Sequence, residues 1–265
     1  MSETAATASA PANAPATPSR LAAWRERFEA LPGWFNEESV LAWDCLLGFQ
    51  AATGRRGHFL EIGVYHGKSA ALAWLHARPG EEIVLVDPYR LGEVRPALEA
   101  VRTGGILTYA VTSDRLPLAE LDRFRGACRW LHVDGEHTGS ACAHDLGVAD
   151  ALLHDGGVVV VDDFMAPNYP QVTAATFAYL HSHPHRLRLF LCGFHKGYLA
   201  RPRTVRPYLE YLRDRLQDDL AARGFGGRIT LWKTTSPDDM NCFGMRAWDG
   251  RTHVGLDWDK TSILV

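Results

Sequence analysis

The 265-residue sequence lacks the features that mark several special classes of protein. It has only four lysines and a formal net charge of -3 at pH 7, so no global positive field would attract nucleic acid. Its five cysteines are odd in number and none are spaced as CxxC, which argues against a zinc cluster or disulfide framework and favours reduced thiols. No apolar run approaches the roughly 18–20 residues of a membrane span. We expect a cytoplasmic protein that binds no nucleic acid and spans no membrane.

What remains is an ordinary globular composition, with 46% hydrophobic and 22% charged residues. Residues 1–18 are mostly Ala, Thr, Pro and Ser and lack both a basic region and an apolar core, so we expect a disordered tail rather than a secretory signal. Four segments are predicted: this tail, an N-terminal helical segment (19–55), a main domain (56–250) and a C-terminal tail (251–265).

The helical segment is predicted from apolar spacing. Four apolar side chains recur at helical intervals before a Pro-Gly break: Leu21, Trp24, Phe28 and Leu31. Asn36 is placed to cap a second helix that stops near residues 53–54. Trp24, Trp34 and Trp43 lie in this segment; they are expected mainly in the core, with stacking on a sugar as the alternative.

From residue 58, short apolar runs alternate with helical stretches, which predicts βαβ units and a doubly wound, Rossmann-like α/β sheet. The predicted strands are 58–62, 83–86, 106–111, 130–133 and 158–161. The predicted helices are 67–77, 92–102, 115–124 and 140–153. Beyond residue 163 we expect a helix (171–182), a strand (186–194) with a hairpin partner (198–200), a long helix (204–223) and two strands (228–233 and 242–247).

The junction after the first predicted strand has glycines at Gly63 and Gly67, spaced GxxxG. Glycine permits a tight turn and bare N–H groups at the start of a helix. The spacing is neither GxGxxG, which would indicate a dinucleotide site, nor the full P-loop pattern, although Lys68-Ser69 follows Gly67. Ligands of open α/β sheets bind at this edge, so the junction is a candidate cofactor site.

Asp87 ends the second predicted strand, where an acid can accept hydrogen bonds from both ribose hydroxyls of an adenosine. The alternative is that Asp87 only begins a turn before Pro88. Ser113 and Asp114 follow the third strand and could contact the adenine or cap the next helix.

The run from Glu61 to Ser69, followed by Val86-Asp87, resembles the class I S-adenosylmethionine-dependent methyltransferases. The resemblance covers about residues 56–200. It implies a mostly parallel sheet with one antiparallel edge strand, and S-adenosylmethionine as cofactor. It assigns cofactor binding to Glu61, Gly63, Tyr65, Gly67, Ser69, Asp87, Ser113 and Asp134.

Acidic residues end the next two predicted strands: Asp134 after the fourth, and Asp162 and Asp163 after the fifth. Neighbouring parallel strands would bring these three carboxylates together, and they repel one another unless a cation or a proton joins them. An all-oxygen set suits Mg²⁺, with another divalent cation such as Mn²⁺ or Ca²⁺ as an alternative. The simpler interpretation is a helix cap and a solvated side chain.

His137 lies three residues beyond Asp134, where a neutral imidazole could take a proton from a substrate hydroxyl. The alternative is a histidine hydrogen-bonded within a loop. The pattern Asp134–His137 followed by Asp162-Asp163 is similar to the metal-dependent sugar O-methyltransferases of the macrocin and mycinamicin type. That resemblance implies that the three aspartates hold Mg²⁺ and that His137 is the catalytic general base. Catechol-type enzymes share such an acid-lined site but use a lysine base, which this segment lacks.

The sequence therefore predicts an O-methyltransferase that acts, with Mg²⁺, on a hydroxyl of a sugar, glycoside or surface glycan. A catechol-like diol is the alternative acceptor. A non-catalytic cofactor-binding scaffold and an NAD-dependent oxidoreductase are the rival functions, and homo-oligomerisation is left open.

Overall fold

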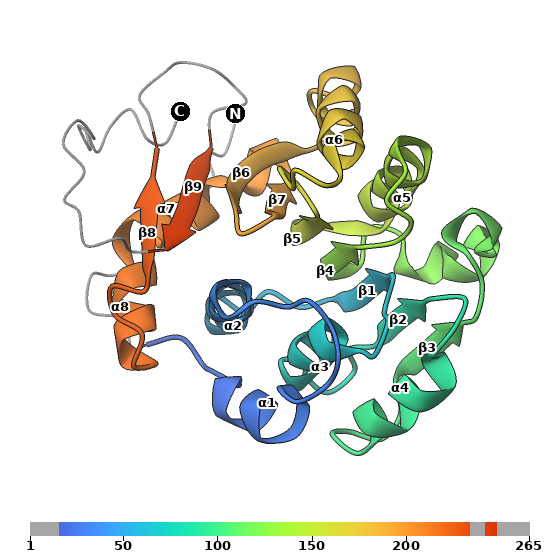
Figure 1. Ribbon diagram of the computed structural model, residues 1–265, viewed down its shortest axis with the longest axis horizontal. Helices are drawn as coiled ribbons and strands as arrows, with labels where there is room; N and C mark the ends of the chain where they lie inside the picture. Colours follow the sequence, from blue (N-terminus) through green and yellow to red (C-terminus); the bar gives the residue numbers. More distant parts are fainter. Residues whose placement is uncertain (1–15, 234–241, 248–265) are drawn as a thin grey trace, which may run out of the picture.

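The computed structural model describes residues 16–233 and 242–247, and the predicted C-terminal tail (251–265) lies outside them. A nine-stranded sheet runs through the protein in the order β3-β2-β1-β4-β5-β7-β6-β9-β8 (Figure 1). Its strands are β1 (His58–Ile62), β2 (Ile83–Val86), β3 (Ile106–Tyr109), β4 (Cys128–Val133), β5 (Leu153–Asp162), β6 (Arg188–Gly193), β7 (Lys196–Ala200), β8 (Ile229–Trp232) and β9 (Phe243–Ala247). The first five are mutually parallel, which confirms the predicted fold class.

Helices cover both faces of the sheet (Figure 1). They are α1 (Leu21–Phe28), α2 (Glu37–Ala52), α3 (Lys68–Leu75), α4 (Leu91–Glu99), α5 (Gly139–Leu152), α6 (Pro170–Ser182), α7 (Arg206–Asp214) and α8 (Leu216–Ala222). One hydrophobic cluster joins α1–α4, α7 and α8 to the sheet, and a second joins α5 and α6 to its other face. Strand β4 is buried along its whole length and β5 is buried over residues 157–161, which explains the uninterrupted apolar run at 158–161.

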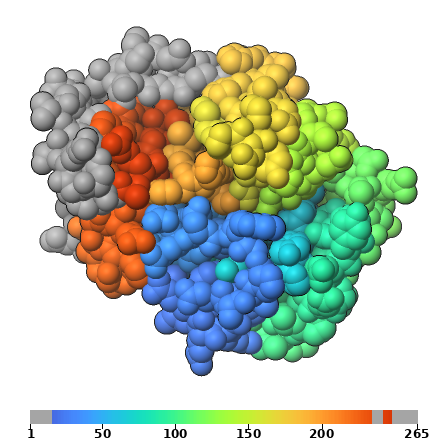
Figure 2. Space-filling model, viewed as in Figure 1, coloured from blue at the N-terminus to red at the C-terminus, as the bar shows by residue number. Residues whose placement is uncertain are grey.

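The N-terminal segment is part of this core. The predicted cap is confirmed, since the N–H of Ser39 donates to Asn36 Oδ1 over 2.7 Å. Trp43 of α2 is fully buried and packs edge-on against Trp130 of β4, with ring centroids 5.1 Å apart. In the space-filling view the blue N-terminal part of the chain lies between the orange α8 region and the cyan-to-green α3–α4 region (Figure 2).

The described residues include 16–18, which were predicted to belong to the tail. Thr17 is nearly buried, and its N–H and Oγ1 donate to the two carboxylate oxygens of Asp219 over 2.9 and 2.7 Å. Local composition cannot indicate that Thr17 binds Asp219, which lies 202 residues later in the chain. Residues 1–15 lie outside the described part of the chain.

Three details differ from the sequence-based expectation. The reversed strand β7 lies between β5 and β6 rather than at the edge, and β9 and β8 extend the sheet beyond it. Predicted helix 115–124 is two 3-10 turns, Ser113–Arg115 and Leu118–Phe124, because Pro117 disfavours helical geometry at the residue before it. Predicted helix 204–223 is divided at Arg215, whose φ of -131° separates α7 from α8.

Candidate active site

Strand register brings the candidate site residues into one row. Ile62, Val133 and Val161 are register partners on β1, β4 and β5, so the residues after them emerge side by side at the carboxyl edge of the sheet. On the other side of β1, Ile62 pairs with Val86, which places Asp87 beside Gly63. These residues line one cavity of about 1070 Å³, which exceeds the roughly 300–1,000 Å³ typical of ligand pockets.

The glycine junction is shaped by close backbone contacts. Gly63 has φ of +81°, and a Cβ there would lie 1.7 Å from the carbonyl oxygen of Asp134. Gly67 has φ of +77° and precedes α3, where a Cβ would lie 2.6 Å from Val94 Cγ1. Each position therefore requires glycine, and the bare start of α3 faces the cavity edge.

Asp87 organises the same junction. Its Oδ2 accepts hydrogen bonds from the N–H groups of Val64 and Tyr65 over 2.8 and 2.9 Å, and its Oδ1 accepts from the N–H of Tyr89 over 2.8 Å. The carboxylate also lines the cavity. Because Oδ1 accepts only one N–H, it keeps a lone pair with which Asp87 can accept from a bound ligand while Oδ2 holds the loop.

Glu61 lies behind the cavity wall. It is 2% exposed and accepts hydrogen bonds from Ser69 Oγ and, at 3.1 Å, from His132 Nδ1. Its side chain links β1 to α3 and β4 and does not line the cavity. Gly67 is likewise beneath the wall, as the residue that starts α3.

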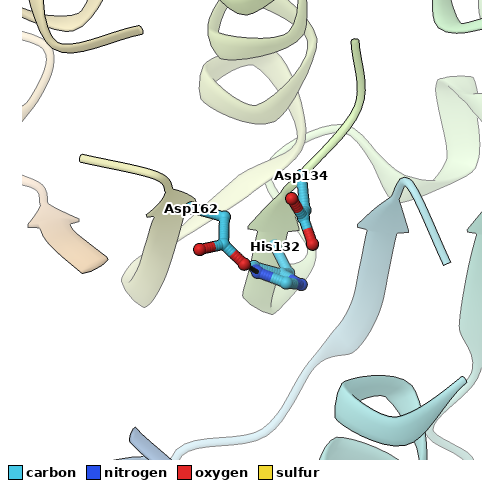
Figure 3. Close-up of side chains that lie close together, drawn as sticks. All are labelled: His132, Asp134 and Asp162. Carbon is cyan, nitrogen blue, oxygen red and sulfur yellow. Dashed lines mark ion pairs between the residues drawn. The ribbon is translucent and has the colours of Figure 1, made fainter. Parts of the chain in front are cut away.

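His132, Asp134 and Asp162 converge from β4 and β5 (Figure 3). The Nε2 atom of His132 lies 3.4 Å from Asp162 Oδ2. Burial disfavours the charged imidazole, but Asp162 and Glu61 outweigh it and raise the pKa of His132 to about 10. Burial and the neighbouring charge of Asp162 raise the pKa of Asp134 to about 7.

Lys196 enters the site from β7 and forms an ion pair with Asp162. Burial would raise the pKa of Asp162, but the charges of Lys196 and His132 hold it well below the usual range. Asp162 therefore has two cationic partners from the protein itself. The acidic cluster does contain a lysine, although it comes from the hairpin strand and not from the segment that follows Asp134.

His137 lies between the other two carboxylates. Its Nε2 is 2.6 Å from Asp163 Oδ2 and 3.7 Å from Asp134 Oδ1, and its ring stacks on Tyr169 with centroids 4.3 Å apart. The bonds to Asp134 and Asp163 raise the pKa of His137 to about 10 against the opposing effect of burial. In this arrangement the positive charge of the His137 imidazolium offsets negative charge on Asp134 and Asp163.

The donor chemistry fits a hard divalent cation. Two groups of side chains could hold a cation, and within each group the ligand atoms lie within 4.8 Å of one another. The groups are His132, Asp134 and Asp162, and Asp134, His137 and Asp163. Asp134 belongs to both groups. The carboxylates of Asp134 and Asp163 share one charged partner, His137. Such oxygens are the ligands that Mg²⁺ prefers.

Backbone strain concentrates around the cavity. Among the residues that the structure describes, five non-glycine residues have positive φ: Tyr65, Asp163, Met165, Phe194 and His195. Tyr65, Asp163 and His195 line the cavity directly. Non-glycine residues held in this region cluster at functional sites, where the surrounding fold maintains them.

An exposed aromatic pair forms part of the rim. Trp34 is 90% exposed and stacks on Tyr65, with centroids 5.8 Å apart and an interplanar angle of 25°. Trp24 and Trp43 are buried, as expected from their spacing, but the core expectation is wrong for Trp34. Trp34 follows Gly33 in the connection between α1 and α2, and this connection lies against Tyr65 and Lys68 and lines the cavity.

Nine of the eleven predicted site residues line the cavity: Gly63, Tyr65, Ser69, Asp87, Ser113, Asp134, His137, Asp162 and Asp163. Three residues described above were not predicted as site residues: His132 and Trp34, which line the cavity, and Lys196, which pairs with Asp162. His132 precedes Asp134 by two residues on β4, and this strand alternation was an available signal. Lys196 depends on the hairpin register, and Trp34 depends on the path of the connection after α1.

Known methyltransferases are similar to this chain in sequence or in fold. Residues 60–164 match the family Methyltransf_24, described as a methyltransferase domain. A solved structure described as apo CalS11, a TDP-rhamnose 3'-O-methyltransferase of calicheamicin biosynthesis, is 17% identical; the match covers 62% of this chain and 80% of CalS11 with a TM-score of 0.51. A second CalS11 structure gives 15% identity, the same coverage and the same TM-score. No curated protein matches the sequence significantly.

Proposed function

We propose that the chain, which has a doubly wound α/β fold and matches a methyltransferase domain over residues 60–164, is an S-adenosylmethionine-dependent, metal-assisted O-methyltransferase that acts on a hydroxyl of a sugar or glycoside. The observation that carries this proposal is the row of Gly63, Asp87, Asp134 and Asp163 along one wall of a single cavity. A glycine junction and a strand-end acid serve the cofactor, while paired carboxylates beside a histidine serve a hydroxyl.

On the cofactor side, Asp87 would accept from the ribose hydroxyls while it holds the N–H groups of Val64 and Tyr65. Because Gly63 has no side chain, the cofactor would be able to lie close to the backbone in front of α3. Ser113 lines the cavity at the end of β3, where an adenine would lie. We assign Glu61 to positioning, since it fixes Ser69 and His132 from behind the wall.

On the acceptor side, we propose that Asp134, Asp162 and Asp163 surround a divalent cation, with Asp134 and Asp163 as the principal ligands. Asp162 contributes less, because Lys196 and His132 already engage its two oxygens. A bound Mg²⁺ would lower the pKa of a chelated hydroxyl and orient it. His137 would accept the hydroxyl proton at Nε2, which requires that Asp134 and Asp163 no longer hold it as an imidazolium.

Two features of the site support a sugar or glycoside as the acceptor. The cavity exceeds the usual size for one ligand, which leaves space for a second molecule beside the cofactor. The exposed ring of Trp34 offers a flat apolar surface for a sugar ring, and CalS11, which has the same fold, is described as acting on TDP-rhamnose. A catechol-like diol is the alternative acceptor, and a non-catalytic scaffold protein is the alternative function.

The test is methyl transfer from labelled S-adenosylmethionine to a panel of glycosides, sugar nucleotides and catechols, with Mg²⁺ or with a chelator. We expect labelled glycoside product only with Mg²⁺, and a loss of about 10²–10⁴ in turnover for His137→Ala with little change in cofactor affinity. Product from catechols alone would select the alternative acceptor. Turnover of His137→Ala equal to that of the unaltered protein would remove this residue as the base.

A further inference from the structure

Two of the five cysteines lie side by side in neighbouring parts of the sheet. The sulfurs of Cys192 and Cys242 are 3.6 Å apart and both residues are partly exposed. Cys192 is in β6, and Cys242 directly precedes β9. The other three, Cys45, Cys128 and Cys142, are buried. Only the pair therefore combines mutual contact with partial access.

The strand pairing places the two cysteines on neighbouring strands but not directly opposite one another. Strands β6 and β9 are parallel neighbours, with Leu191 opposite Phe243 and Cys192 opposite Gly244, two residues beyond Cys242. The side chains bridge this offset, since the two sulfurs are 3.6 Å apart. A disulfide bond is about 2.0 Å long, so its formation requires Cys242, which precedes β9, to shift toward β6.

The electrostatics distinguish the two sulfurs. The Cys242 thiol donates its hydrogen bond to Cys192, which lowers the pKa of Cys192 against the effect of burial. The same bond and burial raise the pKa of Cys242, while the positive charges of Lys233 and Arg188 oppose that rise. Since the thiolate is the nucleophile in thiol–disulfide exchange, Cys192 is the attacking residue.

We propose that Cys192 and Cys242 form a redox-active dithiol that low-molecular-weight disulfides, such as oxidised glutathione, convert to an intramolecular disulfide. The Cys192 thiolate attacks one sulfur of oxidised glutathione and displaces one glutathione thiolate. Cys242 then loses its proton and attacks the Cys192 sulfur of the mixed disulfide, which releases the second glutathione. The protein loses two electrons and two protons, and one glutathione disulfide becomes two thiols.

The position of the pair links this modification to the cavity. Gly193 follows Cys192 and has no room for a side chain, since a Cβ would lie 2.4 Å from the carbonyl oxygen of Met245 in β9. The chain then turns through Phe194 and His195, both at positive φ, and His195 lines the cavity. A disulfide would therefore tie β9 to the strand that carries this turn.

The test uses the full chain in buffers with graded ratios of reduced to oxidised glutathione, followed by acid quenching, alkylation and mass spectrometry. We expect Cys192 and Cys242 to lose alkylation together, with a cross-linked peptide that dithiothreitol separates. Cys192→Ser and Cys242→Ser should abolish the cross-link, and Cys128→Ser, which alters a buried cysteine, should leave its midpoint unchanged.

Three results would overturn the proposal: no cross-link in fully oxidised glutathione, stable glutathionylation of one cysteine without closure, or equally fast oxidation of the three buried cysteines. Circular dichroism of each sample shows that the protein is folded. A higher urea midpoint for the oxidised chain would support a bond formed within the native sheet. The measurement involves neither cofactor nor acceptor, so it is independent of the proposed methyl transfer.

Discussion

Lys196 and Asp162 are register partners in the β5–β7 ladder, and their side chains form an ion pair at the edge of the acidic cluster. The side chains are 4% and 11% exposed, so the pair is largely withdrawn from water. The end of β5 therefore supplies the acid, and the start of β7 supplies the cation that pairs with it. This relationship leaves Asp134 and Asp163 as the less engaged carboxylates of the site.

We expect Lys196→Met to lower the free energy of unfolding by about 3 kcal/mol, because it leaves Asp162 buried without its main partner. Adding Asp162→Asn should recover part of that loss, with a coupling energy of about 0.5–3 kcal/mol in a double-mutant cycle from urea unfolding. The matched control is the exposed pair Arg203–Asp155, for which the coupling should stay below about 1 kcal/mol. Strict additivity for the buried pair would contradict this account.

Divalent-cation binding should depend on Asp163. Replacing its carboxylate by an amide in Asp163→Asn removes a charged oxygen ligand, and we expect the affinity for Mg²⁺ to fall about tenfold or more. Calorimetric titration with Mg²⁺ measures the change. Asp122→Asn, at an exposed surface position, serves as the control. Unchanged affinity in both Asp163→Asn and Asp134→Asn would place the cation elsewhere.

The exposed ring of Trp34 should contribute to acceptor binding. Aromatic contacts contribute about 0.5–1.5 kcal/mol, so Trp34→Ala should raise the KM for the acceptor about 2- to 10-fold with kcat nearly unchanged. Trp34→Phe keeps a ring and should retain most of the affinity. Steady-state kinetics with each substrate varied in turn separate the effects; a change confined to the KM for S-adenosylmethionine would assign Trp34 to the cofactor instead.

The stability contributed by Asp44 should depend on pH. Buried Asp44 bonds to His76 Nε2 over 2.8 Å and to Arg223 Nε over 2.6 Å. Burial would raise the pKa of Asp44, but these partners hold it well below its usual value. A depressed folded-state pKa contributes stability that is complete above the unfolded-state pKa near 3.9 and is lost as pH falls further.

Asp44→Asn should therefore cost about 3 kcal/mol at neutral pH, because it removes the closer of the two buried carboxylates that pair with Arg223. The difference between the two proteins should narrow below about pH 4, where the carboxylate of the unaltered chain gains protons in the unfolded state. Urea unfolding at neutral pH and near pH 3 measures both gaps. A gap of constant size would show that Asp44 contributes by packing and not by charge.

The fold could be predicted because its signals are local. Buried parallel strands such as residues 158–161 are continuous apolar runs, and Asn36 caps α2 through its own side chain. The row of Gly63, Asp87, Asp134 and Asp162 was also predictable, since the carboxyl ends of parallel strands share one edge. No knowledge of side-chain packing was needed for either result.

What the sequence did not reveal depends on contacts between distant segments. The Lys196–Asp162 pair requires the register of a hairpin, and the inward orientation of Glu61 requires its bonds to Ser69 and His132. The break at Arg215 has no glycine or proline to mark it. Thr17 is held by Asp219, which local composition cannot indicate.

The most direct test of the central claim is calorimetric titration of the purified chain with S-adenosylmethionine, with and without Mg²⁺. We predict binding in the micromolar range, about -8 kcal/mol at a Kd of 1 μM, that is weakened at least about tenfold in Asp87→Ala and unchanged in Asp122→Asn. A folded chain that binds no S-adenosylmethionine under either condition would contradict the assignment of this cavity to the cofactor.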